Sequence, residues 1–223
     1  MSLSSEHIAW FFIADLSGYT ALTESHGDEH AADVVTQYGS IVESVVNSPV
    51  RCIERVGDEA LIVSPDAAAA IQTAVRLHQA AEREPFFPAI RIGVHGGAVI
   101  EREGSYFGAV LNVTARVAAH ARGGQILCTV AAASAASGLT GVEFRSIGPI
   151  RFRNVAEPIE IFEVFTTTGG TREAIDVDPV CRMQVKPETA PARLRFGGNS
   201  YHFCSLTCAK KFAEEPERYL PRG

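Results

Sequence analysis

The chain lacks a long apolar run and an excess of basic residues, and both absences limit what it can be. Its longest nearly apolar stretch, residues 8–14, is far short of the roughly 20 residues that cross a bilayer, and it lacks the basic start of a secretory signal. The formal net charge of −6 does not favour a binder of nucleic acids or anionic membranes, which present a basic surface. We therefore expect a soluble, cytoplasmic protein without a nucleic-acid or membrane partner.

Cysteine is rare until the last fifth of the chain. Cys52 and Cys128 stand alone among apolar neighbours, and we expect both to be buried as small apolar side chains. The remaining three, Cys181, Cys204 and Cys208, lie close together in sequence. In a cytosolic protein such a cluster indicates metal or redox chemistry more often than a structural disulfide.

The three clustered cysteines have the composition of a soft metal site. Cys204 and Cys208 would face one way at a helix start, with Cys181 arriving from a knuckle. Three thiolates, with His202 or Met183 as a further ligand, suit Zn²⁺ or Cu⁺. A metal would also stabilise a module too small to bury much surface. The alternative is that the thiols are reduced and simply packed.

Composition divides the chain in two. Residues 166–173 (TTTGGTRE) are polar, glycine-bearing and without periodicity, which indicates a linker. We predict a first domain over residues 1–166, a linker over 167–174 and a small second domain over 175–223.

Hydrophobic spacing predicts strands alternating with helices in the first domain. Strands are expected at residues 8–15, 52–56, 60–63, 89–100 and 125–128, with two more within 147–165, and helices at 29–47, from 65 to 78 or beyond, and at 111–121. Gly57 and Asp58 form a dipeptide favoured in two-residue hairpin turns. Mixed strands and helices with hairpins predict an α+β sandwich, one sheet with helices packed on it.

Two carboxylates stand where these strands end or turn. Asp15 ends the first strand and Asp58 lies in the hairpin turn, so both meet at one sheet edge if the hairpin lies beside the first strand. Carboxylates that close repel each other unless a cation separates them, and two Mg²⁺ ions about 3.5–4 Å apart fit phosphoryl transfer. Asp is common in turns, so a purely structural Asp58 is the alternative.

Asn112 and Arg116 are spaced to project from one face of an expected helix. A planar guanidinium beside an amide suits phosphate oxygens and a sugar. A solvated helix face is the alternative explanation for the same pair.

Taken together, four blocks resemble the catalytic domain of class III nucleotide cyclases. In the order and spacing of that family, the blocks are residues 12–20 (FIADLSGYT), 55–61 (RVGDEAL), 91–97 (RIGVHGG) and 106–116 (YFGAVLNVTAR), followed by 123–125 (GGQ). The resemblance covers about residues 8–165 and implies a ferredoxin-like, palm-type α+β sandwich with nucleotide cyclase activity. A similarity of residues 55–59 to the GGDEF signature of diguanylate cyclases is less favoured, because Val56 replaces a signature glycine.

The resemblance implies a role for each matched residue. Asp15 and Asp58 would bind two Mg²⁺ or Mn²⁺ ions that bridge the triphosphate of ATP or GTP. Asn112 would orient the ribose, and Arg116 would neutralise charge on the α-phosphoryl oxygens in the transition state. Further phosphate contacts would come from the backbone amides of one turn and from a weakly matched arginine: Leu16, Ser17, Gly18, Tyr19, Thr20 and Arg153. In this family the two halves of a site belong to different subunits, which implies a homodimer.

Two positions that set base choice in this family depart from the adenylate cyclase pattern. Adenylate cyclases usually have Lys and Asp where this chain has Glu54 and Ser105, whereas animal guanylate cyclases have Glu and Cys. The Glu54 carboxylate can accept from guanine N1–H and its amino group, and the Ser105 hydroxyl can donate to O6, which favours GTP and cGMP over ATP and cAMP. The alternative is a base pocket that has lost its selectivity.

The end of the chain resembles a YHS domain. The resemblance spans about residues 176–221 and rests on residues 178–185 (DPVCRMQV), 195–204 (RFGGNSYHFC), 208–212 (CAKKF) and 216–220 (PERYL). We therefore expect a cyclase whose output responds to a metal- or redox-sensing module. An inactive cyclase fold that binds nucleotide or dimerises, and a metal-handling protein with a dimerising front domain, are the alternatives.

Overall fold

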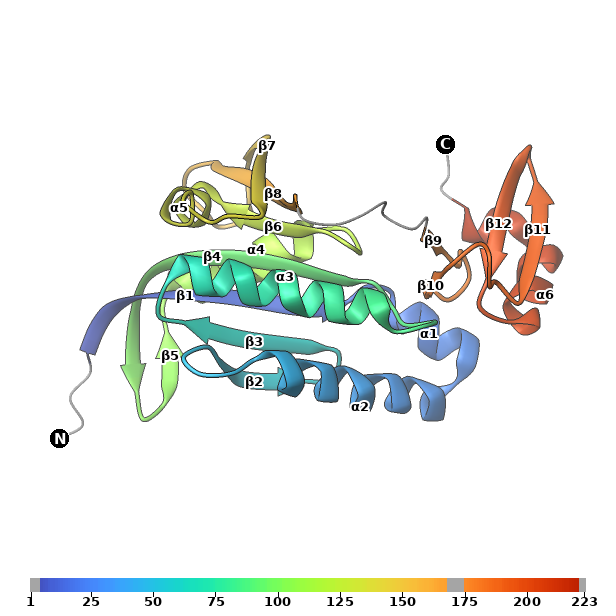
Figure 1. The fold of residues 1–223 in the computed structure, drawn as a ribbon, viewed down its shortest axis with the longest axis horizontal. Coiled ribbons are helices and arrows are strands. Elements are labelled where there is room, and N and C mark those ends of the chain that lie inside the picture. Colours follow the sequence, from blue (N-terminus) through green and yellow to red (C-terminus); the bar gives the residue numbers. More distant parts are fainter. Residues whose placement is uncertain (1–4, 168–174, 221–223) are drawn as a thin grey trace.

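A single mixed sheet forms the centre of the first domain. The computed structural model describes residues 5–167 and 175–220, and the predicted linker lies outside them apart from Thr167. The strand order is β2-β3-β1-β4-β6-β8-β7, with β5 paired to the end of β4 (Figure 1). Its first four strands, β1 (Ser5–Leu16), β2 (Arg51–Val56), β3 (Glu59–Ser64) and β4 (Ile90–Arg102), are antiparallel. This β1-helix-β2-β3-helix-β4 order gives the expected ferredoxin-like α+β fold.

The remaining strands extend the sheet beyond β4. Strand β6 (Ile126–Thr129) runs parallel to β4, and it is followed by β8 (Ile159–Thr166) and the edge strand β7 (Val142–Ile150). The short β5 (Ser105–Phe107) folds back on β4 as a hairpin. Sequence spacing predicted all of these strands except β5, which is only three residues long.

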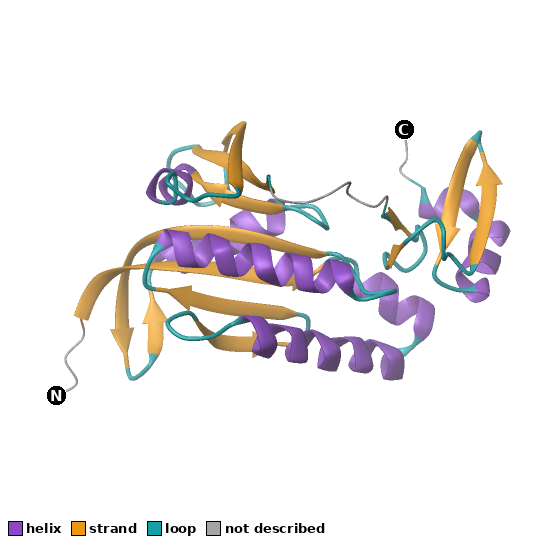
Figure 2. Ribbon diagram, viewed as in Figure 1, coloured by secondary structure: helices purple, strands orange, loops and turns teal. Residues whose placement is uncertain are grey.

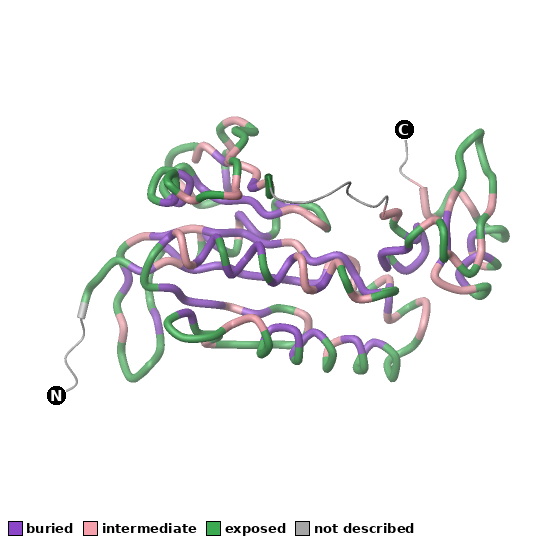
Figure 3. Tube along the Cα trace, viewed as in Figure 1, coloured by how far each residue is buried: buried purple, intermediate pink, exposed green. Residues whose placement is uncertain are grey.

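Helices cover both faces of the sheet (Figure 2). On β1, Phe12, Ala14 and Leu16 pack in the large core with α2 (Asp28–Val45) and α3 (Ala67–Arg83). The alternate residues Ala9 and Phe11 face Val110 of α4 (Ala109–His120). Because strand side chains alternate between faces, α4 lies opposite α2 and α3. Figure 3 shows the buried trace concentrated in this centre.

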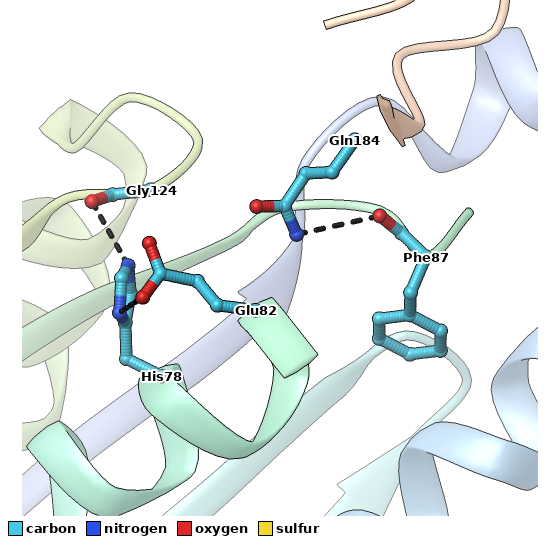
Figure 4. Close-up of polar contacts among 5 residues, drawn as sticks. All are labelled: His78, Glu82, Phe87, Gly124 and Gln184. Carbon is cyan, nitrogen blue, oxygen red and sulfur yellow. Dashed lines mark hydrogen bonds and ion pairs between the residues drawn. The ribbon is translucent and has the colours of Figure 1, made fainter. Parts of the chain in front are cut away.

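Local signals fix where several elements begin. The Asp66 carboxylate accepts from the backbone N–H of Ala69 at 2.8 Å and so caps α3 instead of lying in its first turn. His78 of α3 donates from Nε2 to the Gly124 carbonyl at 3.0 Å and lies 3.5 Å from Glu82, which ties the helix to the loop before β6 (Figure 4). Two short helices, α1 (Tyr19–His26) and α5 (Val130–Ala135), were not expected from the spacing.

The C-terminal module is built from small elements. Its strands pair as β9 (Asp176–Val177) with β10 (Gln184–Val185) and β11 (Ala192–Phe196) with β12 (Asn199–Phe203). Helices α6 (Leu206–Glu214) and α7 (Pro216–Tyr219) follow. The aromatic ring of Phe212 packs against those of Phe203 and Tyr201, with centroids 5.2 and 5.0 Å away.

The module shares its apolar core with the first domain. Val180, Met183 and Phe203 belong to the same buried cluster as Leu22 and Phe87. Within the described residues, no helix has both the length and the apolar character needed to span a bilayer.

The expected burial of the isolated cysteines holds for one of them. Cys128 is buried on β6, as expected. The prediction for Cys52 is wrong: its side chain is exposed, because β2 lies at the edge of the sheet and its outer face is uncovered. Apolar neighbours in sequence do not reveal that a strand is at an edge.

Candidate active site and metal cluster

Asp15 and Asp58 lie at the same edge of the sheet, as the hairpin predicts. Asp15 stands near the end of β1 opposite Glu59, the first residue of β3. The backbone N–H of Leu16 donates to the Asp58 carbonyl at 3.1 Å, which joins the two segments directly. Asp15 is 8% exposed, whereas Asp58 is partly exposed. The arrangement places one sheltered and one accessible carboxylate together.

Negative charge is crowded at this edge. Burial raises the pKa of Asp15 to about 6, the hydrogen bond and charge of Arg91 oppose that rise, and the charges of Asp58 and Glu59 add to it. Arg91 pairs with Asp15 across strands β1 and β4, with guanidinium nitrogens 2.5 Å from Oδ2. Carboxylate oxygens are the ligands that Mg²⁺ prefers, and a divalent cation relieves such crowding. These side chains therefore fit a magnesium or manganese site.

The turn after β1, residues 16–20, has fewer backbone N–H groups able to donate to a phosphate than its length suggests. The N–H of Leu16 is engaged by Asp58, and that of Ser17 donates to the Ala89 carbonyl at 2.8 Å. Gly18, with φ +87°, caps the N-terminus of α1. The first N–H groups of a helix have no acceptor within it. The amides of Leu16 and Ser17 therefore hold the turn through backbone carbonyls, and contact with phosphate stays a prediction for the start of α1, at Gly18, Tyr19 and Thr20.

Asn112 and Arg116 line one open pocket of about 520 Å³ with residues 154–156. Both lie on α4, and the Arg116 Nε donates to the Arg153 carbonyl at 2.6 Å, which positions the guanidinium. Asn154, next along the chain, has φ +61°, a tight turn that brings this carbonyl toward the helix. The Arg153 side chain itself is exposed.

The two pairs of residues belong to different places on the chain, because the pocket lined by Asn112 and Arg116 includes neither Asp15 nor Asp58. In the described part of the chain, no hydrogen bond or ion pair joins Asp15 or Asp58 to Asn112 or Arg116. The base-selecting candidates Glu54 and Ser105 are both exposed, on β2 and β5. A hydrogen bond of 2.6 Å from Arg51 to the Tyr106 hydroxyl brings their two strands together.

The three clustered cysteines meet as expected, but the fourth residue is unexpected. Cys181, Cys204, Cys208 and His26 place their ligand atoms within 4.8 Å of one another. His26 ends α1 of the first domain. His202, an expected candidate, instead contacts the Asp176 carboxylate through Nδ1 at 2.5 Å.

Met183, the other expected candidate, is 2% exposed. It pairs through its backbone with Pro88 and packs in the shared core. No sequence spacing relates His26 to Cys208, 182 residues further on, so only the fold reveals the histidine.

A buried carboxylate holds the cysteine-bearing segments together. Asp178 is 0% exposed; its Oδ1 accepts from the N–H of Val180 at 2.8 Å, and its Oδ2 from that of Cys204 at 2.8 Å. Cys208 lies in the first turn of α6, which Ser205 caps. Hydrogen bonds from Cys181 and then Cys204 lower the pKa of the Cys208 thiol, so one thiolate is stabilised by two neighbouring thiols.

Comparison with known proteins supplies the family of each part. Over 171 residues the chain is 30% identical to a pH-sensitive adenylate cyclase of Mycobacterium tuberculosis, covering 74% of this chain and 43% of the relative. Residues 177–222 match the model of the YHS domain. This chain carries a class III nucleotide cyclase domain followed by a YHS domain. It spans less than half the length of the curated adenylate cyclases it matches.

Solved structures agree on the fold of the cyclase domain. The adenylyl cyclase CyaB from P. aeruginosa superposes with a TM-score of 0.66 at 18% identity, covering 74% of this chain and 97% of that one. The guanylyl cyclase Cya2 superposes with a TM-score of 0.63 at 22% identity, covering 74% and 94%. Both likenesses concern the fold, which adenylyl and guanylyl cyclases share.

Proposed function

We propose that the cyclase domain converts a purine nucleoside triphosphate into its 3′,5′-cyclic nucleotide and pyrophosphate, at sites shared between two copies of the chain. One observation carries the proposal: the pocket lined by the amide–guanidinium pair includes neither carboxylate, and within the described residues no hydrogen bond or ion pair joins the two pairs. Two copies related by a two-fold axis can bring one half from each copy together twice.

The residues divide the work between the two copies. Asp15 and Asp58 of one copy would hold the cations at the sheet edge. The backbone amides of Gly18 to Thr20, at the start of α1, would donate hydrogen bonds to the terminal phosphates. The Mg²⁺ or Mn²⁺ held by these carboxylates would supply the positive charge that lowers the pKa of the ribose 3′-hydroxyl. Asn112 of the other copy would orient the ribose, and its Arg116 would face the charge that grows on the α-phosphoryl oxygens.

The proposal also specifies the purine base of the substrate. Glu54 and Ser105 carry an acceptor and a donor that match guanine, which supports GTP. The relatives at about 30% identity are named adenylate cyclases, which supports ATP. We propose GTP as the preferred substrate, because Glu54 would repel the N1 acceptor of adenine.

An inactive domain that binds nucleotide without converting it is the second candidate. The contact of Arg91 with Asp15 favours it, because the guanidinium already balances the charge of one carboxylate. Turnover and binding must therefore be measured on the same protein.

The decisive experiment identifies the product. The full chain is incubated separately with ATP and GTP in Mg²⁺ or Mn²⁺, and the product is identified by mass. We expect a cyclic nucleotide, formed faster from GTP, and none from the double variant Asp15→Asn, Asp58→Asn. Wild-type output no higher than that of the double variant would remove the enzymatic claim, and nucleotide binding without turnover would establish the inactive alternative.

Complementation tests the shared site. A second double variant, Asn112→Ala with Arg116→Ala, is inactive alone. Mixed with the Asp15→Asn, Asp58→Asn variant, it forms mixed dimers in which one of the two sites is complete. Random pairing then restores about a quarter of the wild-type rate. If both variants are inactive alone and the mixture stays inactive although exchange of subunits is demonstrated, the shared site is excluded.

A further inference from the structure

Four soft ligand atoms converge where the YHS domain meets the end of α1. His26 Nε2 lies 3.4 Å from the sulfur of Cys208 and 3.5 Å from that of Cys204. The Cys204 sulfur is 3.4 Å from that of Cys181 and 3.7 Å from that of Cys208. All five cysteines of the chain are free thiols, so the short distances do not come from a disulfide.

These separations are those of ligands around one tetrahedral ion. With Zn–S of about 2.3 Å and Zn–N of about 2.0–2.1 Å, tetrahedral angles place two sulfurs about 3.8 Å apart and a sulfur and a nitrogen about 3.5 Å apart. Three thiolates and one imidazole are a ligand set typical of structural zinc sites. Two of the four residues, Cys181 and Cys208, are buried, which shields such a site from solvent.

The ligands come from both domains. Three are supplied by the YHS domain, where Asp178 orients the backbone at Cys181 and Cys204. The fourth, His26, is the last residue of α1 in the cyclase domain. An ion at this place therefore joins the two domains.

The YHS domain also contacts α1 at both of its ends. At the C-terminal end, Lys211 Nζ donates to the Ser25 carbonyl at 2.9 Å, where a cation favours the helix dipole. At the N-terminal end, the Arg182 side chain lies against Gly18: a Cβ added to this glycine would be 2.5 Å from the Cβ of Arg182. The eight residues of α1 are thus held between two contacts with one partner.

A third contact reaches the segment beside the turn. The backbone N–H of Gln184 donates to the Phe87 carbonyl at 3.0 Å and its side-chain amide to the same oxygen at 3.4 Å (Figure 4). Two residues later, the Ala89 carbonyl accepts from Ser17 of the turn. The YHS domain therefore contacts the turn before α1 directly at Gly18 and indirectly, through residues 87–89, at Ser17.

We propose that His26, Cys181, Cys204 and Cys208 form a tetrahedral Zn²⁺ site that joins the two domains and fixes α1 and the turn before it. The metal would act on the turn through His26, because α1 is a short helix that begins at the turn and ends at the ligand. That the turn receives the triphosphate rests on the function proposed above; the metal site and its effect on α1 do not.

Metal titration of the full chain tests the ligand set. Reduced, metal-free protein is titrated with Co²⁺, whose absorption reports tetrahedral geometry and thiolate ligands, and then with Zn²⁺. We expect one ion per chain and displacement of Co²⁺ by Zn²⁺. His26→Ala should weaken binding by more than the 10–100-fold that loss of a ligand's hydrogen-bond partner costs, whereas His26→Cys should retain the site with a stronger thiolate-to-cobalt absorption.

His30 supplies the matched control. Its ring lies 5.1 Å from that of His26, on the neighbouring helix, and its side chain is exposed. His30→Ala should bind Co²⁺ and Zn²⁺ like the wild-type chain. A His26→Ala variant with wild-type affinity and spectrum, or a chain that binds Cu⁺ through its thiols and no Zn²⁺, would overturn the proposed site.

Hydrogen exchange tests the coupling without any nucleotide. Amide exchange of residues 16–27 is compared with and without one equivalent of Zn²⁺, in the wild-type chain and in His26→Ala. Zn²⁺ should slow exchange in the wild-type chain, and in His30→Ala, but not in His26→Ala. If Zn²⁺ binds through His26 and exchange of residues 16–27 is unchanged, the coupling is wrong. Absence of cyclase activity would leave both readouts intact, so the two proposals fail separately.

Discussion

The cyclase domain and the YHS domain are incomplete in opposite ways. The cyclase domain has long strands and apolar cores on both faces of its sheet, yet the halves of its candidate active site are apart on one chain. The YHS domain has strands of only two and five residues and shares its apolar core with the larger domain, yet three of its ligand atoms already converge. On the proposals above, the larger domain would need a second copy for chemistry, and the smaller one would be stabilised by its neighbour.

The two candidate metal sites differ in their ligand atoms. At the sheet edge the donors are carboxylate oxygens, hard ligands that suit an ion arriving with substrate. At the domain junction they are sulfurs and an imidazole, soft ligands that suit an ion that stays. Helix α1 lies between the two sites, so binding of an ion at one site would alter the backbone order at the other on the proposal above. Three substitutions sharpen this contrast.

Removing the guanidinium of Arg116 should have the largest effect. On the proposed function, Arg116→Ala deletes a donor that would face charge developing in the transition state, and such donors contribute about 10²–10³ in kcat. We expect a loss of that size with unchanged Zn²⁺ binding, measured by steady-state kinetics and metal titration.

Arg122→Ala is the control, since Arg122 is exposed just beyond α4. It should retain kcat within a few-fold. An Arg116→Ala variant whose kcat falls less than about tenfold, a barrier change under 1.4 kcal/mol, would place Arg116 outside the chemistry.

Protonation of His95 on unfolding should lower the free energy of unfolding of the cyclase domain at acid pH. Burial lowers the pKa of His95 to about 4, and its Nδ1 lies 2.9 Å from the Thr129 hydroxyl. The unfolded chain binds the proton near pH 6.5, so the free energy of unfolding falls as the pH drops from about 6.5 to 4. Between pH 7 and pH 5 His95 alone contributes a loss of about 2 kcal/mol, which the raised pKa of Asp15 offsets in part because the folded chain binds that proton more readily than the unfolded chain.

Urea unfolding of metal-free protein at the two pH values measures this loss. His95→Gln should therefore lose about 2 kcal/mol less than the wild-type chain between pH 7 and pH 5, whereas the exposed His30→Gln should behave like the wild-type chain. Equal pH dependence in wild type and His95→Gln would assign the acid sensitivity to another group.

Changing the contact between Gly18 and Arg182 should have the smallest effect of the three, measured as the free energy of unfolding. Gly18→Ala places a Cβ at a left-handed backbone position, which costs about 1–2 kcal/mol, and also against the Arg182 side chain. Arg182→Gly should recover the steric part, so a double-mutant cycle should give a coupling of about 1 kcal/mol.

Gly27→Ala is the matched control, because Gly27 has φ +86° and nothing within 4 Å of an added Cβ. Its cost should be that of the backbone alone and independent of Arg182. Zero coupling between Gly18→Ala and Arg182→Gly in urea unfolding would mean that the two domains separate at this contact in solution.

Much of the fold was predictable because the signals are local. The Gly57-Asp58 turn predicted the β2–β3 hairpin, and helical spacing predicted α2, α3 and α4. Three elements of the first domain were missed, namely α1, β5 and α5, because eight, three and six residues are too few to show a period. The exposure of Cys52 depends on strand order, which no single segment contains.

The candidate site was predictable only where its residues lie in one motif. Asp15 and Asp58 followed from a strand end and a hairpin turn, and the four-residue spacing placed Asn112 and Arg116 on one helix face. The hydrogen bonds that occupy the amides of Leu16 and Ser17 come from distant residues, Asp58 and Ala89. The same holds for His26, whose partners are set by the packing of one domain on another.

The distance along the chain between His26 and Cys208, 182 residues, bears on how the protein is made. The histidine leaves the ribosome 182 residues before the last cysteine. The proposed four-coordinate arrangement cannot form until residue 208 has been synthesised, whatever the supply of zinc. The cyclase domain would thus fold first with α1 unanchored, and binding of the ion would be a later maturation step.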